Sequence, residues 1–346
     1  MPRYDLTRDD LTAFLAAERP YRVTQTWDGL WQRGLEIDEI TELPEPLRAR
    51  LTAMPELAAA LAPERFVDTD RGTTRKWLWR LADGARIETV LMHYPGRSTV
   101  CISSQAGCAM ACSFCATGQA GFSRNLSAGE IIEQVVRARR AAAESGRRLS
   151  NVVFMGMGEP LANYDRVWRS VELLHGELSF SARHITVSTV GVAPGILRLA
   201  EEDLPVNLAV SLHAANDALR NSLVPLNRRY PLSEIVKACH TYLQAKGRRI
   251  SFEWALIADV NDRPTDAREL AEIARELRAH VNLIPLNPTP GYATPGTPPA
   301  GVREFRDQLR GLGVNATVRQ NRGTSIDAAC GQLAGAVRRT DVSLTH

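Results

Sequence analysis

The chain has 346 residues, 44% hydrophobic and 23% charged, which are the proportions of an ordinary folded protein and exclude a disordered chain, a collagen-like repeat and a disulfide scaffold. Its 42 basic and 39 acidic residues give a net charge of +3, which permits a nucleic-acid partner without indicating one. No apolar run reaches the roughly 18 residues of a membrane helix, and the first residues lack a secretory signal, so we expect a cytoplasmic protein without a membrane partner.

Residues 1–65 carry apolar side chains at a spacing of three to four, which predicts short helices and no strands. From Lys76 the period changes to two, and segments 76–81 and 86–91 predict a β-hairpin around Asp83 and Gly84. We therefore expect a small helical accessory domain over 1–65 and a hairpin extension over 66–95. The predicted helices of the accessory domain are 6–18, 23–31 and 44–62.

Beyond residue 96, short apolar strands alternate with amphipathic helices, as in parallel β/α units. One of these helices, Ala128–Glu144, is preceded by a capping box of Ser127 and Glu130. The pattern predicts an α/β fold over 96–340 in which a parallel sheet curls into an open or closed barrel. The predicted strands are 98–103, 151–155, 184–190, 206–212, 250–256, 280–286 and 315–320.

Polar or glycine-rich residues follow several of these strands. Parallel barrels carry their chemistry at the carboxyl ends of the strands, so we expect these residues to converge on one mouth, although a Ser or Asn at a strand end is also an ordinary turn or cap. The stretch 288–301, rich in Pro, Gly and Thr, is predicted to be a loop, either a lid over the mouth or a surface excursion. The strand-end residues are Gly156–Glu159, Ser188, Thr189, Ser211–His213, Glu253 and Asn287.

Three cysteines, Cys108, Cys112 and Cys115, lie within eight residues after the first predicted barrel strand. A structural zinc site has four ligands, and no nearby residue supplies the fourth, since His93 and Cys101 both lie upstream. A 4Fe-4S cluster held by three thiolates keeps one iron open for another ligand. The trio therefore indicates a metal centre of that kind rather than three core thiols.

This cysteine spacing, with Phe114 before the last cysteine, is the signature of the radical S-adenosylmethionine (SAM) enzymes. Within that superfamily the chain resembles the RlmN family, which methylates carbon 2 of adenosine in 23S ribosomal RNA and in transfer RNA. The resemblance spans roughly residues 20–340 and implies a partial, TIM-like (β/α) barrel. Its motifs are 101–108, 118–126, 156–160, 211–214 and 327–335.

The resemblance implies that Cys108, Cys112 and Cys115 hold one 4Fe-4S cluster per chain and that two SAM molecules are consumed in each methylation. It also implies 23S rRNA and tRNA substrates contacted in part by residues 1–65, an electron donor such as flavodoxin or ferredoxin, and a monomeric enzyme. The residues that it assigns to SAM binding are Gly158, Glu159, Ser188, Ser211, Leu212, His213 and Asn287.

The resemblance further implies three catalytic residues. Cys330 takes a methyl group from one SAM, and a 5′-deoxyadenosyl radical made from a second SAM removes a hydrogen from that methyl, which then adds to adenine carbon 2. Glu88 is the proton acceptor, and Cys101 resolves the protein–RNA adduct by forming a transient disulfide with Cys330. Without the resemblance, both cysteines would be interpreted as core residues and Glu88 as a solvent-facing carboxylate.

A barrel mouth admits only an unstacked adenine, so we expect recognition through RNA shape, phosphate contacts and a flipped base. We favour the pair Arg319 and Arg322 for RNA contact because it precedes Cys330, although a run of helix-borne charge is usually a solvated face. The arginine clusters are Arg137, Arg139 and Arg140; Arg147 and Arg148; Arg228 and Arg229; and Arg319 and Arg322.

Two other functions remain open on the sequence. The sister family of the Cfr type shares the cluster and both cysteines but methylates carbon 8 of the same rRNA adenosine and confers antibiotic resistance. A non-catalytic metal- or RNA-binding module would instead hold zinc on the three thiols. The contexts 156–160 and 330–335 favour the carbon-2 enzyme, and Cys239 and His240 are predicted to be structural.

Overall fold

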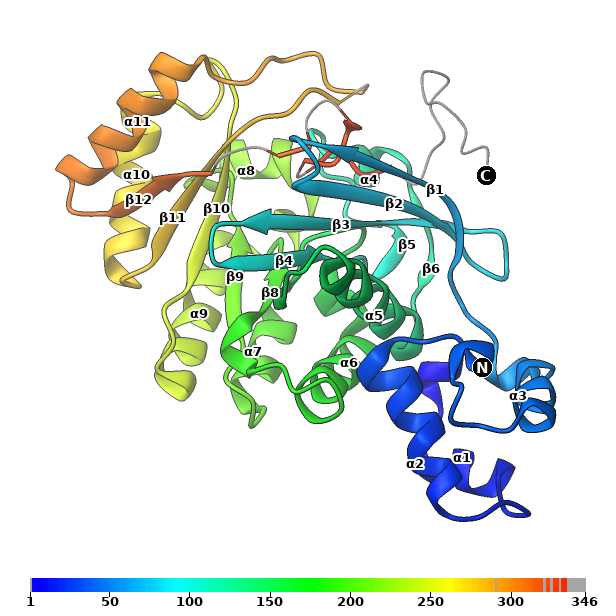
Figure 1. The fold of residues 1–346 in the computed structure, drawn as a ribbon. Helices are drawn as coiled ribbons and strands as arrows, with labels where there is room; N and C mark the ends of the chain where they lie inside the picture. Colours follow the sequence, from blue (N-terminus) through cyan, green and yellow to red (C-terminus); the bar gives the residue numbers. More distant parts are fainter. Residues whose placement is uncertain (1, 290, 320–321, 324–325, 330, 335–346) are drawn as a thin grey trace.

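One sheet runs through the part of the chain that the computed structural model describes, which is residues 2–289, 291–319, 322–323, 326–329 and 331–334 (Figure 1). In this part its ten strands follow the order β1-β2-β3-β4-β7-β8-β9-β10-β11-β12. The strands are β1 (Ala62–Thr69), β2 (Thr74–Arg80), β3 (Arg86–Tyr94), β4 (Arg97–Cys101), β7 (Leu149–Phe154), β8 (Ile185–Thr189), β9 (Asn207–Ser211), β10 (Ser251–Leu256), β11 (His280–Pro285) and β12 (Asn315–Val318). A second sheet pairs β5 (Gln105–Gly107) with β6 (Phe122–Asn125).

Along the order of the large sheet, the strands from β4 through β7 to β12 pair in parallel. Strands β1 to β4 pair antiparallel and extend this sheet at one end. Because β1 and β12 stand at opposite ends of the strand order, the sheet does not close into a full barrel within the described residues. The predicted partial barrel is therefore confirmed, as is the hairpin, in which β2 and β3 pair in register around Asp83 and Gly84.

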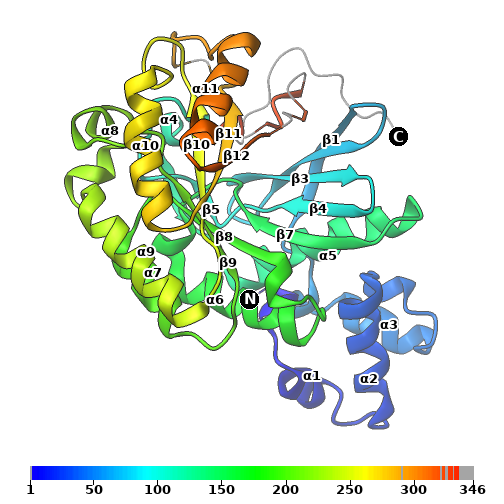
Figure 2. The ribbon, with the colours of Figure 1, turned by 90° about the vertical axis from the view of Figure 1, so that its left-hand side faces the viewer.

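Helices pack on the outer side of the parallel strands because each parallel connection needs a crossover (Figures 1 and 2). Helix α5 has its predicted bounds, with Ser127 Oγ accepting from the Glu130 N–H (3.1 Å) and the Glu130 carboxylate accepting from the Ser127 N–H (2.9 Å). No helix of the described residues is long and apolar enough to cross a membrane. The helices of this part are α5 (Ala128–Glu144), α6 (Tyr164–Gly176), α7 (Ala193–Glu201), α8 (Asp217–Leu223), α9 (Leu232–Lys246), α10 (Pro264–Glu276) and α11 (Pro299–Gly311).

The N-terminal residues form short helices that lie apart from the barrel strands, beside α5 (Figure 2). The helices are α1 (Arg8–Phe14), α2 (Tyr21–Asp28) and α3 (Glu45–Thr52). The prediction of one helix over 44–62 is wrong beyond Thr52, and the prediction that 1–65 lacks strands is wrong from Ala62 onward. Strand β1 was missed because it contains Pro63, which a sheet tolerates here at an edge strand where the register shifts.

The predicted loop 288–301 is likewise wrong at its end, because α11 begins at Pro299. Proline fits the first turn of a helix, where its missing N–H leaves no intrahelical bond unmade. In α9, Cys239 is fully buried in the core, and His240 contacts Glu276 at 2.7 Å, both in structural surroundings as predicted.

Candidate active site

A cavity lies at the carboxyl ends of the parallel strands. The expectation that the strand-end residues converge on one mouth is confirmed, since every predicted strand contributes at least one residue to the wall except the first. The predicted site residues that line it are Cys108, Cys112, Cys115, Gly158, Glu159, Ser188, Ser211, His213 and Asn287.

The loop that carries the three cysteines is held in shape by the small sheet and by the short helix α4 (Ala116–Gln119). The Cys108 N–H donates to the Gly121 carbonyl at 2.8 Å, and Cys115 is the residue before the first turn of α4. Gly118 faces the Cys112 backbone, where an added Cβ would come within 3.0 Å of its nitrogen. The glycines of this region are therefore needed for close packing around the thiols.

Burial raises the pKa of the Cys108 thiol to about 12 and that of Cys112 further, and the neighbouring thiols add to both shifts. Thiols whose pKa is raised by burial become thiolates only when a cationic centre compensates their charge, so the donor set fits an iron–sulfur cluster. Within the described ranges, no three Cys, His, Asp or Glu side chains surround a position for a single metal ion. All three thiols line the cavity wall.

Glu159 is fixed at the carboxyl end of β7 by its own backbone and carboxylate. Its N–H donates to Gln105 Oε1 (2.9 Å), and its two carboxylate oxygens accept from the N–H groups of Leu161 (3.0 Å) and Val190 (2.8 Å). Burial raises its pKa to about 7. The residue before it, Gly158, has φ +101° and would place a Cβ 2.5 Å from the Gln105 Cβ, so this turn requires glycine.

His213 connects the ends of two strands to the cysteine loop. Its Nδ1 accepts from the Ala255 N–H at 3.0 Å, and its ring meets the Phe114 ring edge-on at 4.7 Å. Burial, followed by the positive charge of Arg220, lowers its pKa to about 3, so the ring is neutral. With Nδ1 acting as acceptor, the neutral ring carries its hydrogen on Nε2.

Arg220, which the sequence analysis did not single out, holds the strand ends that form the mouth. This fully buried side chain donates to the carbonyls of Leu212 (2.9 Å) and Val190 (2.6 Å) and to Asn227 Oδ1 (2.7 Å). Leu212, predicted to bind SAM, is itself buried and outside the cavity wall. It relates to the site through its carbonyl contact with Arg220 and through its N–H, which donates to the Glu253 carbonyl at 3.0 Å. One arginine among 42 basic residues carries no sequence signal of this role.

The three predicted catalytic residues lie in different surroundings. Glu88 on β3 and Cys101 on β4 are buried and do not line the cavity, and Cys330 lies outside the described residues. The segment around Cys330 does reach the cavity, since Gly331 and Leu333 form part of its wall.

This C-terminal segment is bound directly to the first turn of α4. The Ala116 N–H donates to the Gly331 carbonyl at 2.7 Å, and the Thr117 hydroxyl donates to the Leu333 carbonyl. The chain that flanks Cys330 is therefore attached to the residues that directly follow Cys115.

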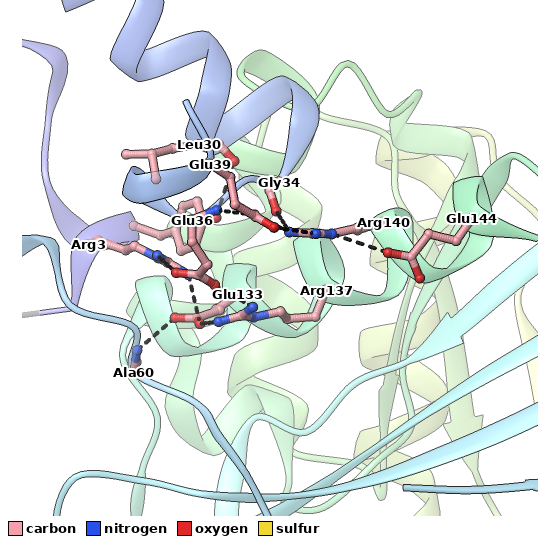
Figure 3. A network of polar contacts seen from close by, with 11 residues as sticks. Arg3, Leu30, Gly34, Glu36, Glu39, Ala60, Glu133, Arg137, Arg140 and Glu144 are labelled. Carbon is pink, nitrogen blue, oxygen red and sulfur yellow. Dashed lines mark hydrogen bonds and ion pairs between the residues drawn. The ribbon is translucent and has the colours of Figure 1, made fainter. Parts of the chain in front are cut away.

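The arginine clusters proposed for RNA contact differ in how they are engaged. Arg137 pairs with Glu36 (2.5 Å) and Glu133 (3.0 Å), and Arg140 pairs with Glu39 (Figure 3). These two guanidinium groups bind the N-terminal helices, so the interpretation of 137–140 as a free basic cluster is not supported.

The remaining clusters lie in other surroundings. Arg319 lines the cavity, and Arg322 lies over the Tyr94 ring at 4.6 Å and donates to Thr73 Oγ1 at 2.8 Å. The pairs Arg147–Arg148 and Arg228–Arg229 are exposed, whereas Arg139 is half-buried.

The radical SAM superfamily model matches residues 102–271. A probable dual-specificity RNA methyltransferase RlmN from Salinispora tropica is 54% identical over 86% of this chain and 82% of its own length. The dual-specificity RNA methyltransferase RlmN 1 of Myxococcus xanthus is 49% identical over 97% of this chain and 95% of its own.

Solved structures agree with these sequence relatives. A radical SAM methyltransferase from Sphaerobacter thermophilus superposes with a TM-score of 0.93 at 51% identity, covering 97% of this chain and all of that one. The hydrogenase maturase HydG is similar in fold alone, with a TM-score of 0.51 at 10% identity over 68% of this chain and 54% of that one.

Proposed function

Since the chain belongs to the RlmN family of dual-specificity RNA methyltransferases of the radical SAM superfamily, we propose that it methylates carbon 2 of adenosine in 23S rRNA and in tRNAs. Carbon 2 lies between two ring nitrogens and is electron-poor, so it does not attack a methyl sulfonium as a ring nitrogen does. A radical route avoids this obstacle, and the family implies the 4Fe-4S cluster and SAM that such a route needs.

In this proposal Cys108, Cys112 and Cys115 ligate one cluster per chain, and the residues at the strand ends hold SAM. Once bound, the cluster and SAM supply a methyl group and a carbon-centred radical that removes hydrogen. Glu159 accepts hydrogen bonds from two backbone N–H groups, and these keep its carboxylate oriented toward the mouth to meet an ammonium group. The neutral His213 ring offers its Nε2–H as a donor.

Three residues then act on the RNA. The Cys330 sulfur accepts the methyl group by nucleophilic displacement and, after loss of one hydrogen, forms a carbon–carbon bond from this methylene to adenine carbon 2. Glu88 takes the proton from carbon 2, and one electron passes from the adduct radical to the one-electron carrier that serves the enzyme. The Cys101 thiolate attacks the Cys330 sulfur, and the carbon–sulfur bond breaks with its electron pair on the carbon. This carbon takes a proton to become the methyl group, and a disulfide that must later be reduced remains.

The attachment of the C-terminal segment to α4 is the observation that supports this mechanism most directly. Gly331 and Leu333 follow Cys330 by one and three residues, and both line the same wall as the three thiols. The carbonyls of both accept hydrogen bonds from the turn after Cys115. A methyl-accepting cysteine has to lie within reach of the bound methyl donor, and this attachment holds Gly331, the residue that follows Cys330, beside the cluster loop.

Product analysis tests the proposal. After anaerobic reconstitution and turnover with 23S rRNA fragments and tRNA, nuclease digestion and mass spectrometry should give 2-methyladenosine and 5′-deoxyadenosine. Detection of 8-methyladenosine instead would indicate the sister activity. A protein that contains zinc without iron or sulfide would exclude both methyltransferases.

Two cysteine variants test the covalent route. Cys101→Ala should accumulate RNA bound covalently through Cys330, because adduct formation precedes the step that needs Cys101. Cys330→Ala should give neither adduct nor methylated RNA. Denaturing gels of labelled RNA measure both, and free unmodified RNA with both variants contradicts the mechanism.

The finer features of the enzyme belong to the same proposal. We assign residues 1–65 as an accessory domain that contacts RNA, 66–95 as the extension and 96–340 as the catalytic barrel. A flavodoxin or ferredoxin is the electron donor, the enzyme acts as a cytoplasmic monomer, and each methylation consumes two SAM molecules.

A further inference from the structure

Lys76, Glu88 and Cys101 lie on the same face of the sheet. In antiparallel pairing, residues that stand opposite each other point to the same side. Lys76 pairs with Val90, and Val90 pairs with Cys101. Glu88 is two residues from Val90 on β3, so its side chain points to this side as well.

Lys76 makes two polar contacts on this face. Its Nζ lies 3.5 Å from Glu88 Oε1 and donates to the Asp327 carbonyl oxygen at 3.3 Å. The side chain of Lys76 is 14% exposed and that of Glu88 is 3% exposed, so solvent screens the pair weakly. Asp327 precedes Cys330 by three residues. One ammonium group thus joins the Glu88 carboxylate to the segment that carries Cys330.

The second carboxylate oxygen of Glu88 is the one that is free to react. Glu88 Oε2 is buried and has no hydrogen-bond partner in the described part of the chain. A buried carboxylate oxygen without a partner is costly for folding, and a catalytic role is one of the explanations for such a group. With Lys76 bound at Oε1, Oε2 is left as the proton-accepting atom.

The charged groups that face the Glu88 carboxylate are Lys76 from β2 and Asp327 from the C-terminal segment. Burial raises the pKa of Glu88, the Lys76 ammonium opposes that increase, and the charge of Asp327 adds to it. The backbone N–H of Ala334 also favours the ionised form. Among the groups described, Lys76 is therefore the cationic side chain that keeps this buried carboxylate ionised.

Lysine is itself uncommon in this chain. Only Lys76, Lys237 and Lys246 are lysines among the 42 basic residues. A lysine ammonium is a compact point charge that can contact a carboxylate and a carbonyl together, whereas the planar guanidinium of arginine needs more room and fixed directions. The compact cation suits this narrow space between two strands and the C-terminal segment.

We propose that Lys76 is a positioning residue that keeps Glu88 ionised and leaves its Oε2 free to take the proton from carbon 2 of the RNA adduct. This inference rests on the proposed function, in which Glu88 is the proton acceptor. It assigns to Lys76 no contact with the substrate.

The test compares Lys76→Met with the matched surface variant Lys237→Met in single-turnover reactions from pH 5.5 to 9. Without the ammonium, the pKa of Glu88 rises, so less of it is ionised and the acidic limb of adduct resolution moves to higher pH. We expect a shift of about one pH unit, which is about a tenfold slower resolution on that limb. Covalent protein–RNA adduct should accumulate at low pH and resolve as the pH rises.

Methylation of Cys330 and formation of 5′-deoxyadenosine precede the proton transfer, so both should stay at the wild-type level in Lys76→Met. Lys76→Arg keeps the charge and should restore the wild-type pH limb in part. If Lys76→Met does not fold, Lys76→Gln takes its place, because it also lacks the charge and should give the same shift of the acidic limb.

A Lys76→Met profile that superimposes on those of the wild type and Lys237→Met overturns the role of Lys76. Glu88→Gln separates this failure from a failure of the proposed function. If Glu88→Gln releases methylated RNA at the wild-type rate, Glu88 is not the proton acceptor and the proposed mechanism itself is wrong. If it accumulates adduct at every pH, the acceptor role holds and the Lys76 profile alone decides this inference.

Discussion

Arg220 shows how one buried side chain can hold the shape of the mouth. It has no exposed surface, and its guanidinium donates to backbone carbonyls at the ends of β8 and β9. Burial lowers its pKa to about 10, so the group stays charged at neutral pH. The strand ends thus depend on a cation that is hidden from solvent.

Arg220→Met should destabilise the protein by about 2–4 kcal/mol, because it leaves several buried acceptors without donors. The measurement is urea unfolding of the reconstituted protein. Arg268→Met removes a guanidinium group that is exposed on α10, and it should change the free energy of unfolding by less than about 0.5 kcal/mol. Equal effects of the two substitutions would contradict the role given to Arg220.

Because Cys239 is buried, we expect the free energy of unfolding to fall at alkaline pH. Burial raises its pKa to about 12, so between the unfolded value near 9 and this value the native state holds a proton that the unfolded state has released. Stability is therefore complete below about pH 9 and is lost as the pH rises toward 12, by up to about 4 kcal/mol. Cys239→Ala should flatten this alkaline decline in unfolding curves, at the cost of about 1 kcal/mol at neutral pH.

At the scale of elements, the short helix α4 acts as the connection between the cysteine loop and the C-terminal segment. The Ala116 N–H donates to the Gly331 carbonyl, and the Thr117 hydroxyl donates to the Leu333 carbonyl. Helix N-termini leave unsatisfied donors, and here a distant part of the chain accepts from them.

Thr117→Val keeps the side-chain shape and removes the hydroxyl that binds Leu333. We expect a lower fraction of S-methylated Cys330 and several-fold less methylated RNA, with the iron and sulfide content unchanged. Mass spectrometry of the Cys330 peptide measures the first quantity. Thr241→Val, on the exposed side of α9, is the control, and a similar loss in both variants would argue against the connection.

At the scale of the whole molecule, a buried ion network joins the N-terminal helices to the barrel (Figure 3). Glu133 on α5 is fully buried and accepts from Arg3 (3.3 Å), Arg137 (3.0 Å) and the Ala60 N–H (2.8 Å). Arg3 is itself only 3% exposed and also pairs with Glu36. The N-terminal helices therefore dock through charges that lie inside the interface.

Glu133→Gln should cost about 3–5 kcal/mol of stability, because it leaves the buried Arg3 and Arg137 undercompensated. Glu144→Gln makes the same change in an exposed pair with Arg140 and should cost less than about 1 kcal/mol. Thermal unfolding followed by circular dichroism compares the two. Similar melting temperatures for both variants would show that this network does not secure the N-terminal helices.

Much of the fold was predictable from local patterns. The capping box of Ser127 and Glu130 set the start of α5, and the apolar runs located every strand of the barrel. Strand β1 was missed because Pro63 and its polar neighbours carry no strand pattern, and the strand exists only because β2 offers it a pairing edge. The end of the 288–301 loop was missed because proline is both a helix breaker and a good first helical residue.

The sequence by itself determined the chemistry. Three thiols at a fixed spacing, and a polar or glycine residue after each of several strands, are properties of the order of residues in the chain. Only the tertiary structure decided which charged side chains are engaged by other residues and which partners they have. It buried Arg220 at the mouth, bound Arg137 to the N-terminal helices, and set Lys76 against Glu88. The physical reason is that the strength of a charge depends on its burial and on partners distant in the sequence, and neither is written in local pattern.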